Sequence, residues 1–145
     1  MKFIKVAVLA AIVVSGSAFA GSIPQYGHGG STSGPNSQLG IFQYGSSNSA
    51  VALQTDARDS SLKITQSGHS NGADVGQGSD DSTIILSQNG SRNSATLDQW
   101  NSRDSDMNVS QYGVGNGALV NQTASQSFVQ VQQVGYGNNA TANQY

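Results

Sequence analysis

The sequence predicts an all-β fold, a β-solenoid of five stacked strand-turn-strand repeats that form two parallel sheets. Two observations carry this prediction. Five segments share the spacing Ser-x5-Gln-x4-Asn-x5-Gln, and apolar and polar residues alternate with a period of two inside each segment. A third observation agrees with them: the chain has no Cys and is rich in Gly, Ser, Asn and Gln, a composition typical of repeats or of disorder. The regular spacing decides between these two.

The five repeats are residues 37–54, 60–77, 82–99, 105–122 and 127–144, and they start alternately 23 and 22 residues apart. Each begins with a serine and carries three amide residues at fixed positions. These amides are Gln43, Asn48 and Gln54; Gln66, Asn71 and Gln77; Gln88, Asn93 and Gln99; Gln111, Asn116 and Gln122; and Gln133, Asn138 and Gln144. Matches at so many fixed positions exclude compositional accident.

Each repeat contains two arms whose apolar residues fall on one face of a strand. In the second repeat these residues are Leu62 and Ile64 in the first arm and Ala73 and Val75 in the second. The Gly-x-x-Asn segment between the arms has turn chemistry. One repeat cannot bury its own apolar face, whereas stacked repeats bury it between two sheets about 10 Å apart.

Stacking places identical residues above one another. We therefore predict that the Gln and Asn columns form amide ladders, in which each side chain donates to one neighbouring repeat and accepts from the other. A laddered amide is satisfied, whereas an isolated buried amide costs a few kcal/mol. The alternative is that the same amides face solvent as spacers.

The N-terminus has the pattern of a secretory signal peptide, expected over residues 1–20. Lys2 and Lys5 precede an apolar run, and Ala18-Phe19-Ala20 ends it. This run is too short to span a membrane. We expect cleavage between Ala20 and Gly21, a flexible Gly/Ser-rich leader over residues 21–36, and an amyloid core over residues 37–145.

The first and last repeats contain no charged residue, whereas the middle repeats and linkers contain many. Ordinary solenoids protect their terminal turns with polar or charged residues, because bare strand edges pair with other chains. Uncharged ends predict head-to-tail polymerisation, since a contact that does not close gives a filament. We expect a marginally stable or disordered monomer.

Other classes of function receive little support. After the predicted cleavage the chain keeps four basic residues against eight acidic ones, which argues against nucleic acid as a partner. His28 and His69 are isolated, so no metal site is expected. No cofactor, catalytic constellation or enzyme activity is expected. The stretch Gly76–Asp80 resembles a calcium-binding β-roll repeat, but it occurs once and such a site needs stacked copies.

The repeats, the signal peptide and the leader beginning Ile23-Pro24-Gln25-Tyr26-Gly27 resemble the curlin family. The resemblance implies a major structural subunit of curli, extracellular functional amyloid fibres that mediate adhesion, aggregation and biofilm formation. It implies export through the periplasm to the cell surface. The implied partners are further copies of the chain, a minor curlin nucleator, an outer-membrane secretion pore with its accessory factors, and host matrix proteins.

The resemblance also implies particular site residues. In the terminal repeats, Gln43, Asn48, Gln133 and Asn138 are implied to respond to nucleation. In the middle repeats, some glycines and aspartates are implied to act as gatekeepers that slow assembly. The gatekeepers are Gly72, Asp74, Gly76, Asp80, Asp98 and Asp106. Gly40 departs from the pattern, because glycine on a terminal strand should weaken β structure.

Two alternatives for the function are kept. The first is the minor, nucleating curlin paralogue, against which the lack of basic residues in the last repeat argues. The second is an ice-binding β-solenoid, which needs a flat outward array of threonines. The outward threonines here fall at unmatched positions: Thr65, Thr83, Thr96 and Thr141.

Overall fold

The computed structural model describes residues 13–14, 23–24, 37–54 and 57–145, and every regular element in this part of the chain is a β-strand. The strands are β1 Val13–Val14, β2 Ile23–Pro24, β3 Gln38–Ser46, β4 Ser49–Gln54, β5 Ser61–His69, β6 Gly72–Asp80, β7 Thr83–Ser91, β8 Ser94–Arg103, β9 Asp106–Val114, β10 Gly117–Gln122, β11 Phe128–Tyr136 and β12 Asn139–Gln144. No helix long and apolar enough to cross a membrane occurs in this described part.

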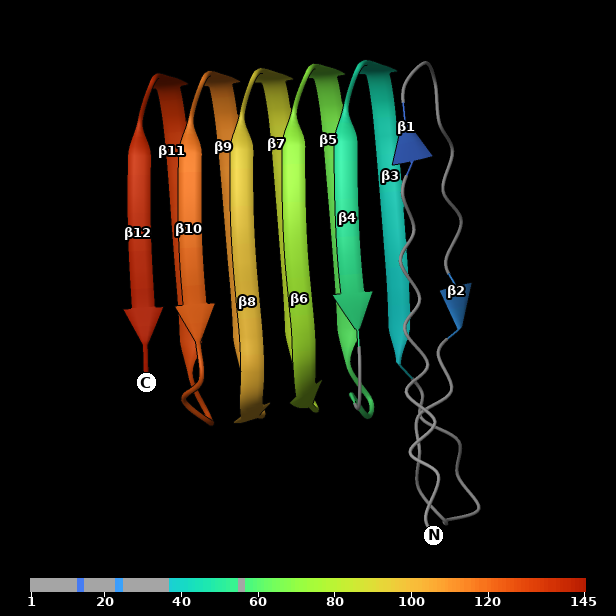
Figure 1. Ribbon diagram of the computed structural model, residues 1–145. Helices are drawn as coiled ribbons and strands as arrows, with labels where there is room; N and C mark the ends of the chain where they lie inside the picture. The colour runs from blue at the N-terminus through green and yellow to red at the C-terminus, as the bar shows by residue number, and fades with distance from the viewer. Residues whose placement is uncertain (1–12, 15–22, 25–36, 55–56) are drawn as a thin grey trace, which may run out of the picture.

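The strands form two six-stranded sheets that face each other (Figure 1). One has the order β1-β4-β6-β8-β10-β12, and the other β11-β9-β7-β5-β3-β2. The first arm of every repeat lies in one sheet and the second arm in the other, and strands of successive repeats pair in parallel. The predicted five-turn β-solenoid with two parallel sheets is confirmed.

Equivalent residues of successive repeats are direct pairing partners. Gln66 pairs with Gln88 between β5 and β7, and Ala73 pairs with Ala95 between β6 and β8. The bends absorb the difference between 22- and 23-residue spacings. The five-residue bend 100–104 stacks on the four-residue bend 78–81, and the pairing of β6 with β8 shifts there. Asn101 in the longer bend adopts a left-handed conformation, with φ 54°.

The core is a thin layer between the sheets. The first arms contribute mostly large aliphatic side chains to the inward face of one sheet. The second arms contribute mostly alanine and valine to the inward face of the other sheet, and large side chains packed against small ones fill a thin core. The buried apolar residues of the arms are Leu39, Ile41, Ala50, Ala52, Leu62, Ile64, Ala73, Val75, Ile84, Leu86, Ala95, Leu97, Met107, Val109, Ala118, Val120, Val129 and Val131. The period-two pattern assigns these residues to the inward face, together with Ala140 and Ala142, which are only partly buried.

A column of glycines forms the bend between the two arms. Gly45, Gly68, Gly90, Gly113 and Gly135 all have positive φ, between 104° and 124°. In the first four, a Cβ atom would collide with the carbonyl oxygen of the next glycine in the column. Gly135 has no such neighbour in this chain, since it stands at the end of the stack. Glycine is therefore required both by conformation and by the close approach of the backbones.

The two ends of the solenoid differ. β11 and β12 are edge strands of the described sheets, whereas β3 and β4 are each paired with a short antiparallel strand, β2 and β1 respectively (Figure 1). The predicted cleavage point between Ala20 and Gly21 lies outside the described residues, as does His28.

Candidate assembly site

The first glutamines of the five repeats form a continuous ladder through the core. Each Nε2 donates to the Oε1 of the next glutamine, at 2.6, 2.8, 2.8 and 2.8 Å from Gln43 through Gln66, Gln88 and Gln111 to Gln133. From Gln66 onward, the same Nε2 also donates to a backbone carbonyl of the facing sheet, such as Ser49 O at 2.9 Å. The three middle glutamines are fully buried. Because the backbone carbonyl fixes the nitrogen, the ladder has one direction.

The last glutamines of the repeats form a second ladder with the same direction. Its Nε2-to-Oε1 distances are 2.8, 3.0, 2.8 and 3.2 Å from Gln54 through Gln77, Gln99 and Gln122 to Gln144. Here too the amide nitrogens have an additional partner, such as Ser82 O at 3.1 Å from Gln77. In both ladders the N–H groups therefore point towards the C-terminal repeat.

The asparagines form a third ladder that runs the opposite way. Each Nδ2 donates to the Oδ1 of the preceding asparagine, at 3.1, 3.0, 3.1 and 3.1 Å along the series Asn71, Asn93, Asn116 and Asn138. The same Oδ1 also accepts the backbone N–H of the following asparagine, as Asn48 Oδ1 does from Asn71 N at 3.0 Å. A backbone donor thus fixes the orientation of these amides.

The directed ladders make the two ends of the stack complementary. At the N-terminal end, Gln43 Oε1 and Gln54 Oε1 are buried without a hydrogen-bond partner. At the C-terminal end, Gln133 Nε2 donates only to Gly117 O at 2.8 Å, and nothing among the described residues accepts from Gln144 Nε2. In the two glutamine columns, the N-terminal end thus lacks donors and the C-terminal end has unused donors, whereas the asparagine column has the opposite direction. An unpaired buried acceptor destabilises a fold by about 1–3 kcal/mol, so a donor supplied to Gln43 Oε1 or Gln54 Oε1 would be favourable.

Comparison with known proteins agrees with this geometry. The family model described as curlin associated repeat matches residues 34–68 and 79–113. The major curlin subunit of Salmonella typhimurium is 66% identical over 86 residues, which cover 55% of this chain and 57% of that protein. The chain thus carries curlin-associated repeats and is similar to a major curlin subunit. The major curlin subunit of Escherichia coli K12 is 66% identical over 89 residues, 57% of this chain and 59% of that protein. The match thus spans less than two thirds of the length of these relatives.

The structure explains how this chain accommodates Gly40 on β3. A Cβ atom at Gly40 would lie 3.2 Å from Cε2 of Phe42, so the phenyl ring lies over the glycine. Lys63 Nζ on the neighbouring strand lies 5.6 Å from the centre of the same ring. The ring thus covers backbone that glycine leaves bare, a known way of compensating for glycine at a sheet edge. The expected weakening of the strand is offset in this way.

The six predicted gatekeepers lie in different environments. Asp74 and Asp106 are exposed on the outer faces of the two sheets, and Asp98 is partly exposed. Gly72 has open space where a side chain would be, but a Cβ on Gly76 would lie 2.9 Å from Asp98 Oδ1 and from Trp100 Cζ2. Their role in slowing assembly stays a prediction.

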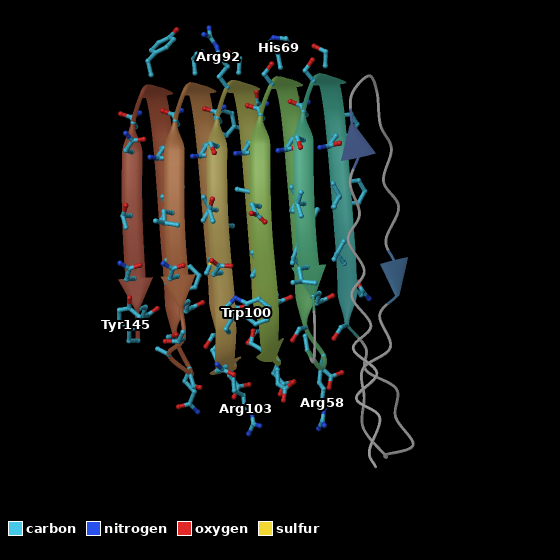
Figure 2. The ribbon with its side chains drawn as sticks, viewed as in Figure 1. Arg58, His69, Arg92, Trp100, Arg103 and Tyr145 are labelled. Atoms are coloured by element: carbon cyan, nitrogen blue, oxygen red, sulfur yellow. The ribbon has the colours of Figure 1, made fainter. Side chains whose placement is uncertain are left out.

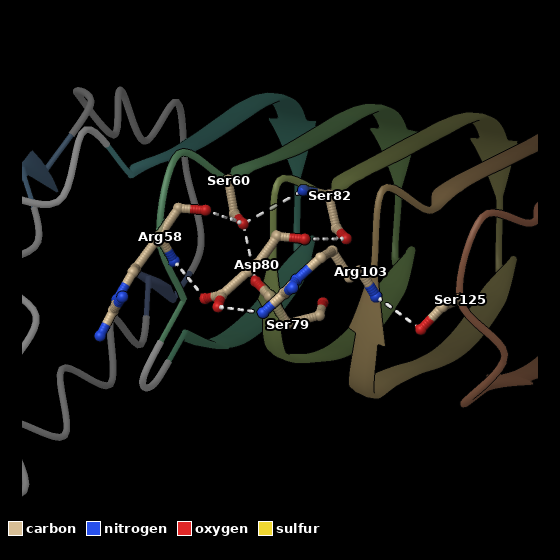
Figure 3. A network of polar contacts seen from close by, with 7 residues as sticks. All are labelled: Arg58, Ser60, Ser79, Asp80, Ser82, Arg103 and Ser125. Atoms are coloured by element: carbon tan, nitrogen blue, oxygen red, sulfur yellow. Dashed lines mark hydrogen bonds and ion pairs between the residues drawn. The ribbon is translucent and has the colours of Figure 1, made fainter.

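The carboxylate of Asp80, a fourth predicted gatekeeper aspartate, has partners at the bend (Figure 3). Its Oδ1 accepts the backbone N–H of Arg58 at 3.1 Å, and its Oδ2 lies 3.9 Å from Nη2 of Arg103. Its backbone carbonyl accepts a hydrogen bond from Ser82 Oγ at 2.7 Å. Arg58 and Arg103 both extend from the bends at this end of the strands (Figure 2). Asp80 therefore also connects three successive bends.

The serines that open the repeats form a further polar column. Ser60 Oγ donates to Ser79 O at 2.7 Å and accepts the backbone N–H of Ser82 at 3.2 Å, and Ser105 Oγ repeats the pattern with Ala124 O and the backbone N–H of Ser127. Sequence reasoning used these serines to define the repeat but assigned them no role in assembly. Their fixed spacing was the signal that could have identified them as a fourth ladder.

No group of three His, Cys, Asp or Glu side chains suited to a metal ion occurs among the described residues. The ring of His69 lies at the opposite bend from Arg103, with Nδ1 2.9 Å from Ser46 Oγ (Figure 2). Outward Thr96 pairs with Leu119 rather than with another threonine, so the column there is interrupted.

Two buried bend serines offer a matched test of the polar core. Ser102 Oγ is buried without a partner, whereas Ser79 Oγ donates to Gln99 Oε1 at 3.2 Å. Ser102→Ala should stabilise the fold by about 1 kcal/mol, and Ser79→Ala should destabilise it by a similar amount. Urea denaturation followed by far-UV circular dichroism measures both. Equal shifts of the same sign would contradict this description of the bends.

Proposed function

We propose that this chain is the structural subunit of an extracellular fibre and that it polymerises head to tail. The β11 and β12 edge of one copy pairs in parallel with the β3 and β4 edge of the next. The solenoid then continues from one molecule into the next without a change of spacing. The relatives described above are major curlin subunits, which supports this assignment.

The observation that carries the proposal is the pair of unpaired acceptors at one end and the spare donors at the other. Continuing the ladder rule places Gln133 Nε2 of one copy against Gln43 Oε1 of the next, and Gln144 Nε2 against Gln54 Oε1. The asparagine column closes in the opposite sense, with Asn48 donating to Asn138. Two like ends brought together would oppose acceptor to acceptor or donor to donor. The amides therefore specify a polar filament.

The same register also continues the apolar core across the junction. Val129 and Val131 of β11 come into line with Leu39 and Ile41 of β3 in the next copy. In the single chain, the C-terminal edge leaves Phe128 58% and Tyr136 82% exposed. Docking of a second copy removes apolar surface from water at this edge and pairs its free backbone groups. A fibre end offers both gains at once, so growth is templated and follows a lag.

The proposed route of export and assembly follows from the predicted segments of the chain. The signal peptide directs it to the periplasm, and the leader of residues 21–36 directs it through an outer-membrane pore with the help of accessory factors. A minor curlin nucleates the fibre at the cell surface. The fibre serves adhesion, aggregation and biofilm matrix formation, with contacts to host matrix proteins. No enzymatic step is part of this function.

Seeded assembly tests the function. Purified chain without its signal peptide should form thioflavin-binding fibres at micromolar concentration, with a lag that preformed seeds abolish. Aligned fibres should give a meridional reflection near the interstrand spacing of about 4.7 Å. Chain that stays soluble for days in the presence of seeds, or fibres that lack this reflection, would refute the proposal.

The junction amides should control growth more than the internal ones. Gln43→Ala and Gln133→Ala each remove one ladder bond at the junction, and a loss of about 1 kcal/mol corresponds to a lag roughly fivefold longer. Gln88→Ala is the matched internal control, since its ladder bonds lie within one chain. Thioflavin kinetics at equal concentration measure all three. A lag as long in the internal variant would contradict the importance of the junction.

The exposed aspartates should slow assembly through repulsion between copies. Replacing Asp74, Asp80, Asp98 and Asp106 with asparagine should shorten the lag about twofold, because screened surface charges have modest effects. Single variants should divide this effect unequally. Asp74→Asn and Asp106→Asn should contribute more than Asp80→Asn, whose carboxylate has local partners. Unchanged kinetics in the quadruple variant would exclude the gatekeeping role.

A further inference from the structure

The edge that receives the next copy in the proposed fibre is already paired with another segment of the same chain. β2, residues Ile23–Pro24, pairs antiparallel with β3, with Ile23 opposite Leu39 and Pro24 opposite Gln38. β1, residues Val13–Val14, pairs in the same manner with β4. Every other strand pair in the described sheets is parallel. The N-terminal edge thus carries a covering of a different kind from the solenoid itself.

β2 and β1 pair with only a small part of the backbone of β3 and β4. It pairs with two of the nine residues of β3 and two of the six residues of β4. Pro24 has no backbone N–H to donate to the neighbouring strand. Gln43 Oε1 and Gln54 Oε1 stay buried without a donor at the covered edge. Each such acceptor costs about 1–3 kcal/mol, so the covered edge keeps an unmet requirement.

A second copy meets that requirement and competes for the same backbone. The spacing of the repeats brings Phe128 and Val129 of the incoming β11 opposite Gln38 and Leu39, the two residues that β2 occupies. One strand edge cannot pair with both. The incoming copy also offers pairing along the whole of β3 and β4, together with the ladder donors. It therefore binds more strongly than the two-residue strand that it displaces.

We propose that β2 is a removable cap on the edge that receives the next molecule, and that it slows self-assembly until another copy displaces it. This proposal rests on the proposed function, because it concerns the same edge. β1 gives the uncleaved chain a second cap on the neighbouring sheet. Removal of the signal peptide leaves β4 free and β3 capped. The chain is thus less prone to polymerise before cleavage than after it.

A reversible covalent lock tests the cap directly. The chain contains no cysteine, so Pro24→Cys with Gln38→Cys introduces a single possible disulfide. Directly opposite residues of an antiparallel pair have Cα atoms about 4.5–5.5 Å apart, which suits a disulfide. Ser61→Cys with Thr83→Cys is the matched control, because these partners lie on β5 and β7, away from both ends. Both pairs are made in the full chain and in the chain from Gly21.

Thioflavin assays of the oxidised and reduced variants test whether the cap slows assembly. The oxidised cap variant should form an intramolecular disulfide, stay monomeric in thioflavin assays, and stop one end of unmodified seeds when added at a low ratio. Reduction should restore growth to the rate of the unmodified chain. The oxidised control pair should grow at the same rate as its reduced form. Loosening the cap with Ile23→Gly and Pro24→Gly should shorten the lag about twofold to tenfold.

The opposite results separate the two proposals. The cap is refuted if its two cysteines fail to form a disulfide, or if the oxidised cap variant grows as fast as its reduced form. Equal inhibition of the oxidised control pair would also refute it. In each of these cases the proposed function stands. If the reduced variants and the unmodified chain all fail to grow from seeds, the proposed function itself is refuted.

Discussion

Vertical register between repeats is the constraint on which the whole structure depends. A buried glutamine is acceptable at the height of Gln66 because Gln43 and Gln88 stand at the same position in the neighbouring turns. The same holds for the asparagine and serine columns and for the alternating apolar residues. A slip of one residue would turn every apolar side chain outward and leave every ladder amide unpaired. The buried polar residues therefore fix the register of the core, and the apolar residues stabilise it.

Much of the fold was predictable from the sequence, because the period of two and the 22- to 23-residue repeat are direct imprints of strand and stack. The inward residues and the three amide columns follow from these periods. The direction of the ladders did not follow, since it depends on which backbone groups face each amide, as Ser49 O does for Gln66. Nor did the pairing of β2 with β3, because two residues carry no detectable period. That Ser102 Oγ lacks a hydrogen-bond partner was likewise not predictable, because it depends on how the bend accommodates an extra residue at Asn101.

The same directed ladders link the structure to the proposed assembly. Within the chain, each turn pairs in register with the next, and the last described turn, formed by β11 and β12, lacks such a neighbour on one side. In the proposed assembly, the boundary between molecules would have the hydrogen bonds of an ordinary turn. Charges on Asp74 and Asp106 lie outside this process, on faces that the stack leaves in water. Their predicted effect on the rate of assembly therefore does not depend on the register.

The glycine column has a consequence for the purity of such a filament. Because a side chain at Gly45, Gly68, Gly90 or Gly113 would strike the neighbouring backbone, a strand joins the column only if it too presents a bare backbone at that height. A foreign β-strand with suitable apolar residues but a larger residue at this bend would be rejected for lack of space. In the proposed fibre, this bend would therefore exclude foreign strands that carry a larger residue there.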